Sequence, residues 1–191
     1  MSFVSVIARK DFITVMTDGR VSFAKQLILK EDYKKFKKIS KKQFIAFTGN
    51  QEYCERIVSL FDYKNAQYNL KEISYQIHEI INQAPYVNFH VNLAIGGLNE
   101  DNEFVVYHVQ NTLKQSIKEL KTKKNKISYG FLNSEYVEKN INTEQKLVEY
   151  LRNTGFNTPN KCLKAQKLLN DYIASKDSSV NRNTFTLKIT R

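Results

Sequence analysis

Two strand-like apolar runs open the chain, and a short polar break separates them. The first run covers residues 3–8 and the second covers residues 12–17, with a break at residues 9–11. The second run ends in an Asp-Gly turn at Asp18 and Gly19. The amino terminus is therefore expected to enter a sheet, and the acidic turn is expected to lie beside it.

The amino-terminal dipeptide contains a candidate nucleophile. Removal of Met1 would leave the Ser2 hydroxyl beside a free α-amino group. Such an amine has an ordinary pKa of about 7.7–8.0, so it can act as the base for its own hydroxyl. Many chains begin with Met-Ser, and an ordinary amino terminus is the simpler interpretation of these two residues alone. The hypothesis therefore depends on the segments that follow.

Those segments supply a basic strand and a strand-to-helix junction. A lysine-rich apolar segment covers residues 34–39, a strand is expected at residues 43–48, and Gly49 and Asn50 precede a helical pattern. An amino-terminal nucleophile, an Asp-Gly turn and this junction together resemble the proteasome family, both its β-type subunits and the bacterial HslV-type peptidase. The likeness extends more weakly over the whole chain.

The resemblance implies a role for each of four residues. Ser2 takes the place of the family's amino-terminal threonine, and Asp18 matches the acid of the Asp-Gly turn. Lys35 matches the lysine that assists deprotonation of the nucleophile, and Gly49 matches the glycine whose backbone N–H faces the oxyanion. A buried ammonium lowers the cost of forming an alkoxide, and a carboxylate keeps that ammonium charged.

The lysine assignment leaves alternatives open, because Lys34 and Lys37 lie close to Lys35. Side chains alternate along a strand, which places Lys35 and Lys37 on one face and Phe36 on the other. Arg20, directly after the Asp-Gly turn, is a further candidate for a supporting role.

The family also has a Gly-Ser-Gly-like element whose serine supports the site. The corresponding stretch at residues 127–130 has Tyr129 where that serine is expected, with Ser128 beside it. Both are candidate supporting residues. Asp177, which is followed by two serines, offers a late acid in a different context.

Hydrophobic spacing predicts an alternating series of elements. Helices are expected after Gly49, across residues 70–84, 133–141 and 144–152, and after Thr158 and Pro159, which suit a helix cap and first turn. Strands are expected at residues 90–95, 103–109, 125–129 and 184–189, and residues 112–120 could extend the sheet.

This order is what the family's fold would require. That fold is an α+β four-layer αββα sandwich, in which two mainly antiparallel sheets pack face to face with helices on both outer sides. Residues 1–191 are expected to form one such domain.

The amino-acid composition agrees with a chain that folds without disulfide bonds. Its 191 residues are 41% hydrophobic, and its 6 glycines and 2 prolines mark no linker. No apolar run approaches the roughly 20 residues that span a membrane, and no signal pattern opens the chain, so a cytoplasmic location is expected. Cys54 and Cys162 are expected as buried thiols, and neither a metal nor an organic cofactor is implied.

Charge suggests a different class of function. The formal net charge is +11, and residues 34–42 contain six lysines. Such surfaces attract nucleic acids and other polyanions. The chain has no aromatic-glycine RNA-binding motif, no helix-turn-helix signature and no zinc spacing, so a lysine-rich surface is the preferred interpretation.

The resemblance implies an amino-terminal-nucleophile hydrolase that cleaves peptide or amide bonds of a peptide or protein substrate. It also implies a homo-oligomer, with a ring as the family's arrangement. The alternative from a different class is a non-catalytic member of the family that serves as a structural or partner-binding subunit.

Overall fold

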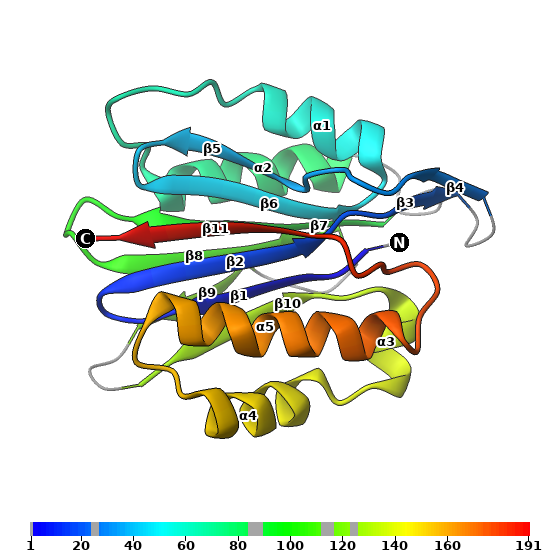
Figure 1. The fold of residues 1–191 in the computed structure, drawn as a ribbon. Coiled ribbons are helices and arrows are strands. Elements are labelled where there is room, and N and C mark those ends of the chain that lie inside the picture. Colours follow the sequence, from blue (N-terminus) through cyan, green and yellow to red (C-terminus); the bar gives the residue numbers. More distant parts are fainter. Residues whose placement is uncertain (1, 24–26, 84–89, 112–116, 123–125) are drawn as a thin grey trace.

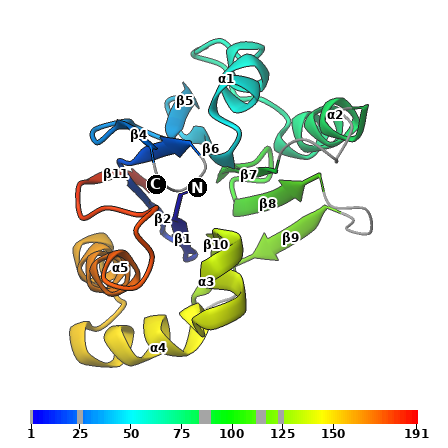
Figure 2. The ribbon, with the colours of Figure 1, turned by 90° about the vertical axis from the view of Figure 1, so that its right-hand side faces the viewer.

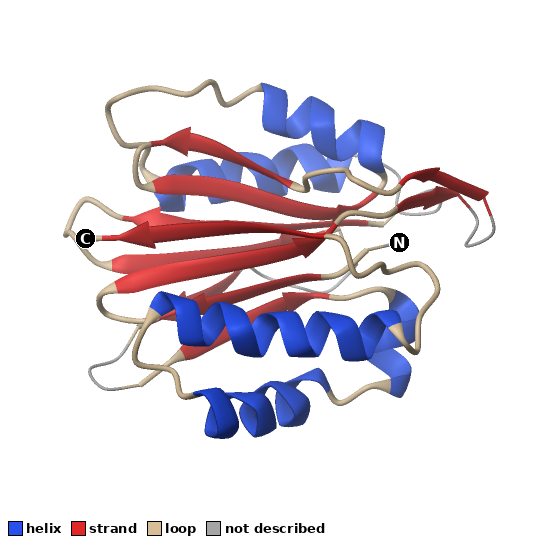
Figure 3. Ribbon diagram, viewed as in Figure 1, coloured by secondary structure: helices blue, strands red, loops and turns tan. Residues whose placement is uncertain are grey.

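Two antiparallel sheets form the centre of the protein (Figures 1 and 3). The computed structural model describes residues 2–23, 27–83, 90–111, 117–122 and 126–191. The four-stranded sheet has the order β10-β1-β2-β11, with strands Ser128–Leu132, Val4–Ala8, Phe12–Asp18 and Thr184–Thr190. The five-stranded sheet has the order β5-β6-β7-β8-β9, with strands Phe36–Ser40, Gln43–Gly49, Val91–Leu98, Phe104–Gln110 and Lys118–Lys121.

The first two strands pair as the sequence predicts. Val4 lies opposite Thr17 in the antiparallel register of β1 and β2. The Asp18 amide continues this pairing, because its N–H donates to the Phe3 carbonyl at 3.1 Å. The start of the chain is thereby placed next to the Asp-Gly turn.

An apolar core fills the space between the two sheets. Side chains alternate along a strand, so Val4 and Val6 of β1 point to one face together with Val15 of β2. These residues pack against Phe44 and Ala46 of β6, and all five are buried. Burial of each larger side chain contributes roughly 1.5–3 kcal/mol.

Helices cover the outer face of each sheet (Figure 2). On the five-stranded sheet, Ile57 and Ile77 belong to the same apolar cluster as Leu93 of β7. These two isoleucines come from α1 and α2, which span Gln51–Ser59 and Leu70–Gln83. On the four-stranded sheet, Ile7 packs in one cluster with side chains of α3, α4 and α5, which span Glu135–Asn140, Thr143–Thr154 and Pro159–Ala174.

Two further predictions about local structure are confirmed. Thr158 caps α5 by accepting from the Lys161 amide, with Pro159 in the first turn. Cys54 and Cys162 are buried free thiols. Burial raises the pKa of Cys54 to about 12, so this thiol stays protonated and serves as a core side chain.

The strand expected at residues 125–129 lies a few residues later, at Ser128–Leu132. The reason is its pairing with β1, which places Leu132 opposite Val4, and both side chains lie in the core between the sheets. Part of the segment expected at residues 112–120 forms β9, and residues 112–116 lie outside the described part of the chain.

A small hairpin lies beside the end of β2 at which Asp18 is found (Figure 1). It consists of β3, Val21–Phe23, and β4, Leu27–Lys30. Among the helices of the described residues, none has the length and apolar character needed to cross a membrane.

Candidate active site

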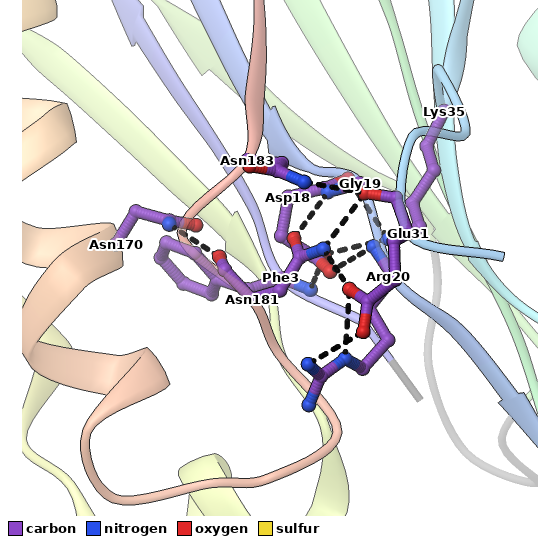
Figure 4. A network of polar contacts seen from close by, with 9 residues as sticks. All are labelled: Phe3, Asp18, Gly19, Arg20, Glu31, Lys35, Asn170, Asn181 and Asn183. Carbon is purple, nitrogen blue, oxygen red and sulfur yellow. Dashed lines mark hydrogen bonds and ion pairs between the residues drawn. The ribbon is translucent and has the colours of Figure 1, made fainter. Parts of the chain in front are cut away.

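Asp18, the last residue of β2, is the centre of a buried hydrogen-bond network (Figure 4). Its side chain is 0% exposed, so its carboxylate must be satisfied by protein groups. Oδ1 accepts from the Phe3 amide at 2.8 Å and from Lys35 Nζ at 2.7 Å. Oδ2 accepts from the Arg20 amide at 2.9 Å. Asp18 therefore fixes the start of β1 and the lysine at the same time.

Lys35 lies directly before β5 and is 2% exposed. Its ammonium also donates to the Asp18 carbonyl at 2.9 Å. Its own carbonyl accepts from the Phe47 amide at 3.0 Å, which holds the backbone of Lys35 against β6. Burial raises the pKa of Asp18 and lowers that of Lys35, and the attraction between the two charges opposes both shifts.

The structure distinguishes Lys35 from its neighbours. The ammonium of Lys34 lies over the ring of Phe36, 5.3 Å from its centroid. Lys37 points to α1, where its ammonium lies 3.4 Å from the carbonyl oxygen of Val58. Of these three lysines, Lys35 is the one that contacts Asp18.

Ser2 lies at the same end of the inter-sheet space. It is 7% exposed and directly precedes Phe3, whose amide is bound by Asp18. Ser2 lines a pocket of about 20 Å³ together with Lys35 and Gly49. The other lining residues are Val21, Ser22, Tyr33, Phe47, Thr48 and Gln51. The structure thus brings Ser2, Lys35 and Gly49 to one pocket, with Asp18 bound to the lysine.

Gly49 occupies a position that only glycine fits. It ends β6 with φ of +112°, and a Cβ atom there would lie 2.0 Å from the His90 carbonyl oxygen. The same carbonyl accepts from the Asn50 amide at 2.8 Å. Asn50 then caps α1, because its side chain accepts from the Tyr53 amide. This junction sets the backbone of Gly49 against the pocket.

Arg20 supports the turn and does not reach into the pocket. Its guanidinium forms an ion pair with Glu31 at 2.8 Å, and its amide alone binds Asp18. Asn181 stabilises the same Asp-Gly turn through two hydrogen bonds. Its side chain accepts from the Gly19 amide at 2.9 Å and donates to the Glu31 carbonyl at 2.8 Å (Figure 4). These contacts tie the segments before β5 and β11 to the Asp-Gly turn.

The structure does not bring Ser128 and Tyr129 to the pocket. They lie opposite Ala8 and Ile7, at the end of β1 that is remote from Ser2. Ser128 donates to the Lys121 carbonyl at 2.7 Å, and Tyr129 donates to a carboxylate on α4. The expectation that Ser128 and Tyr129 support the site is therefore not met. The reason is strand direction: β10 runs antiparallel to β1, so its later residues, and not Ser128 and Tyr129, approach the Ser2 end of β1.

Ser134 and Asp177 form a pair that the sequence did not connect. Ser134 follows β10, toward the Ser2 end, and its hydroxyl donates to Asp177 Oδ2 at 2.6 Å. The Ser179 amide donates to Asp177 Oδ1 at 2.9 Å. Burial raises the pKa of Asp177, but these hydrogen bonds outweigh it and the net shift is downward. Two local features of the sequence could have drawn attention to this pair: Ser134 is the residue that caps α3, and Asp177 is followed by two serines.

Comparison with known families decides the affiliation. A family model described as proteasome subunit matches residues 4–153. The chain belongs to the proteasome subunit family. The match includes Asp18, Lys35 and Gly49, while Ser2 lies two residues before its range and Asp177 follows it. A search among curated proteins found no match.

Proposed function

We propose that the chain, after removal of Met1, is an amino-terminal-nucleophile hydrolase that cleaves peptide bonds with Ser2 as nucleophile. The observation that carries the proposal is the shared pocket of Ser2, Lys35 and Gly49, with Lys35 paired to buried Asp18. A hydroxyl nucleophile, a nearby cation and a backbone N–H donor can together support acyl transfer. Family membership is consistent with this chemistry.

The proposed reaction has two stages. The Ser2 hydroxyl oxygen attacks the substrate carbonyl carbon, its proton passes to the Ser2 α-amine, and that amine then protonates the departing nitrogen. The resulting ester on Ser2 is hydrolysed by water, with the amine again accepting and returning a proton. The Lys35 ammonium stabilises the developing negative charge on the serine oxygen, and the Gly49 N–H stabilises the oxyanion. No metal or organic cofactor takes part in this scheme.

Asp18 has two roles in this scheme. It keeps Lys35 charged through the contact at 2.7 Å, and it holds the Phe3 amide one residue from the nucleophile. Positioning of reacting groups can supply several kcal/mol of a reaction barrier. In place of Ser128 and Tyr129, we propose the pair of Ser134 and Asp177 as the supporting polar group at this end of β1.

The fold proposal follows from the packing described above. We propose that residues 1–191 form one domain with a four-layer αββα sandwich, and the two sheets with their outer helices support this proposal. We further propose a homo-oligomeric ring in the cytoplasm acting on a peptide or protein substrate. Support for self-association comes from β4, where Leu27, Ile28 and Leu29 are 58%, 46% and 55% exposed.

The test is hydrolysis of a mixed peptide library by protein whose first residue is Ser2. The chain is expected to release new peptide amino termini, and Ser2→Ala is expected to remove the activity. Ser128→Ala is the matched control and is expected to retain activity, because Ser128 lies away from the pocket. Equal activity of the Ser2→Ala variant would contradict the proposal, and folded protein without any hydrolysis would favour a non-catalytic subunit.

A further inference from the structure

Strand β11 forms an open edge of the four-stranded sheet. It ends the strand order β10-β1-β2-β11, and within the described part of the chain β2 is its only paired neighbour. Figure 2 shows β11 on the side of the molecule remote from β9. An edge strand has a row of main-chain N–H and C=O groups that can pair with a further strand. Another extended chain can therefore be added to the sheet at β11.

The register with β2 determines which main-chain groups of β11 face outward. The Asn183 carbonyl accepts from the Gly19 amide at 2.8 Å. The Arg191 amide donates to the Asp11 carbonyl at 3.3 Å. In an antiparallel pair, residues that bond the partner strand alternate with residues that do not. Odd-numbered residues of β11 therefore bond β2, and the even-numbered residues direct their N–H and C=O groups away from it. The outward residues are Thr184, Thr186, Lys188 and Thr190.

Three of these four outward positions have no main-chain partner among the described residues. The Thr190 carbonyl accepts from the ammonium of Lys42. No hydrogen bond joins the outward main-chain groups of Thr184, Thr186 or Lys188 to another described segment. These positions alternate along the strand, as the bonds to an added strand would. Strands of about five residues are common, so this length of edge is sufficient for pairing.

The other contacts of β11 hold it in place without a further neighbour. Leu187 and Ile189 are buried in the core between the two sheets, and their main-chain groups bond β2. The side chains of Thr186 and Lys188 lie on the opposite face of the strand and are exposed. The strand is therefore already ordered, and an added chain does not have to order it on binding.

The charges near this edge are positive. Lys188 is exposed on β11 itself, and the ammonium of Lys42 lies at the last residue of the strand. Lys38 is exposed on β5, the edge strand of the other sheet on the same side of the molecule (Figure 2). Alternation places Lys38 on the same face of β5 as Phe36, which packs in the core between the sheets. Within the described ranges, none of these three lysines forms an ion pair.

Charge distinguishes between a second copy of the chain and a different partner. The formal net charge of +11 makes two copies repel each other. Antiparallel pairing of two β11 strands over their full length would also bring their Lys188 side chains near each other, and like charges on neighbouring strands are destabilising. A strand with carboxylate side chains would instead meet opposite charge. The edge therefore favours an acidic partner.

We propose that β11 is a docking edge for an acidic, extended segment of another protein, which adds to the four-stranded sheet as a further strand. The main-chain groups of Thr184, Thr186 and Lys188 supply the hydrogen bonds, and the three lysines supply the preference for acidic sequences. This inference goes beyond the proposed function and does not depend on it, because no residue of β11 lines the pocket at Ser2.

Fluorescence anisotropy with three labelled peptides of equal length tests the partner class. The peptides are alternating Glu-Val, alternating Lys-Val and alternating Glu-Pro sequences. Glu-Val is expected to bind at least roughly 10-fold more tightly than either of the others. Lys-Val has the wrong charge, and Glu-Pro has the right charge but lacks half of the N–H groups and resists strand pairing. Equal binding of Glu-Val and Glu-Pro would show charge attraction without strand addition and would overturn the inference.

Substitutions in β11 test the place of binding. Thr186→Pro removes one outward N–H and leaves the bonds to β2, a change that edge strands tolerate. Affinity for Glu-Val is expected to fall at least roughly 10-fold, whereas Thr186→Val keeps the N–H and is expected to bind as the unaltered chain does. Lys188→Glu is expected to reverse the preference between Glu-Val and Lys-Val. Lys71→Glu makes the same charge change at an exposed residue of α2 and is the control.

Hydrogen exchange at single amides gives a readout that needs no variant, and it decides the matter if Thr186→Pro does not fold. Addition of Glu-Val is expected to protect the amides of Thr186 and Lys188 and to change those of Leu187 and Ile189 little, because the latter already bond β2. Protection that does not alternate, or no protection, would overturn the inference. Self-association of the unaltered chain that disappears in Thr186→Pro would assign the edge to a second copy and overturn the acidic partner.

Discussion

The ammonium of Lys35 lies 2.7 Å from the carboxylate of Asp18, and neither side chain is more than 3% exposed. Both charged groups are buried away from water, so each of them would be left uncompensated if its partner were removed. The carboxylate also binds the Phe3 amide, so the same pair positions the residue next to Ser2. A structural ion pair and the proposed catalytic centre are therefore one unit.

Removal of one charge from this pair is expected to destabilise the fold. Lys35→Met leaves the Asp18 carboxylate buried without its cation, and the free energy of unfolding in urea is expected to fall by about 3–5 kcal/mol. The double variant Lys35→Met with Asp18→Asn is expected to recover most of that loss, because no uncompensated charge remains. If the single and double variants lost stability additively, the coupling of the two residues would be refuted.

Gly49→Ala is expected to disrupt the junction of β6 and α1. The substitution combines a φ of +112° with a contact of 2.0 Å to the His90 carbonyl oxygen, and the expected loss is at least about 3 kcal/mol of unfolding free energy. Gly130→Ala is the matched control. Its added Cβ meets only the end of the Leu120 side chain, at 2.8 Å, and the expected loss is within about 1 kcal/mol. Similar losses for both would contradict the structure at Gly49.

Acid sensitivity is expected from His108, which lies on β8 and contacts Asn92. Burial, with the nearby charge of Lys118, lowers its pKa from 6.5 to about 4. Between these two values the unfolded chain binds a proton that the folded chain does not. The unfolding free energy is therefore expected to fall by about 3 kcal/mol as pH drops from 6.5 to 4.

The control for this titration is His108→Gln, which retains a hydrogen-bonding side chain. The difference in unfolding free energy between the two proteins is expected to change with pH in that window and to be constant above about pH 7.5. A difference that is independent of pH from 4 to 7 would show that His108 does not titrate as inferred.

Self-association is expected to depend on the exposed face of β4. A double substitution, Leu27→Ser with Leu29→Ser, removes two of its three large apolar side chains. The unaltered chain is expected to form an oligomer by light scattering, and the double variant is expected to shift toward the monomer. Leu168→Ser, at an exposed residue on α5, is the control. A monomeric unaltered chain would contradict the proposed ring.

Much of this fold could be predicted from local pattern. Alternation located β1, β2 and β6, and helical spacing located α1 and α2, because each of these elements buries one face. The register of β10 could not be predicted in this way. It is determined by the pairing of Val4 with Leu132, which joins segments far apart in the sequence. The misplaced expectation for Ser128 and Tyr129 follows from that one shift.

The site shows the same division between local and long-range information. The family resemblance proposed Asp18 and Gly49 as site residues, and both lie at turns with local sequence signals. The sequence did not decide which of Lys34, Lys35 and Lys37 lies at the site, because only tertiary contacts distinguish these three lysines. It also gave no reason to join Ser134 to Asp177, because that hydrogen bond connects the ends of two segments brought together by packing.

The chemical behaviour of Ser2 tests the central claim most directly. Protein that begins at Ser2 and protein that retains Met1 should be treated with a serine-directed acylating electrophile and analysed by intact mass and peptide mapping. A single adduct on Ser2, formed only when Met1 is absent and lost in Lys35→Met that is still folded, is the predicted result. No adduct on Ser2, or equal modification with Met1 retained, would contradict the account.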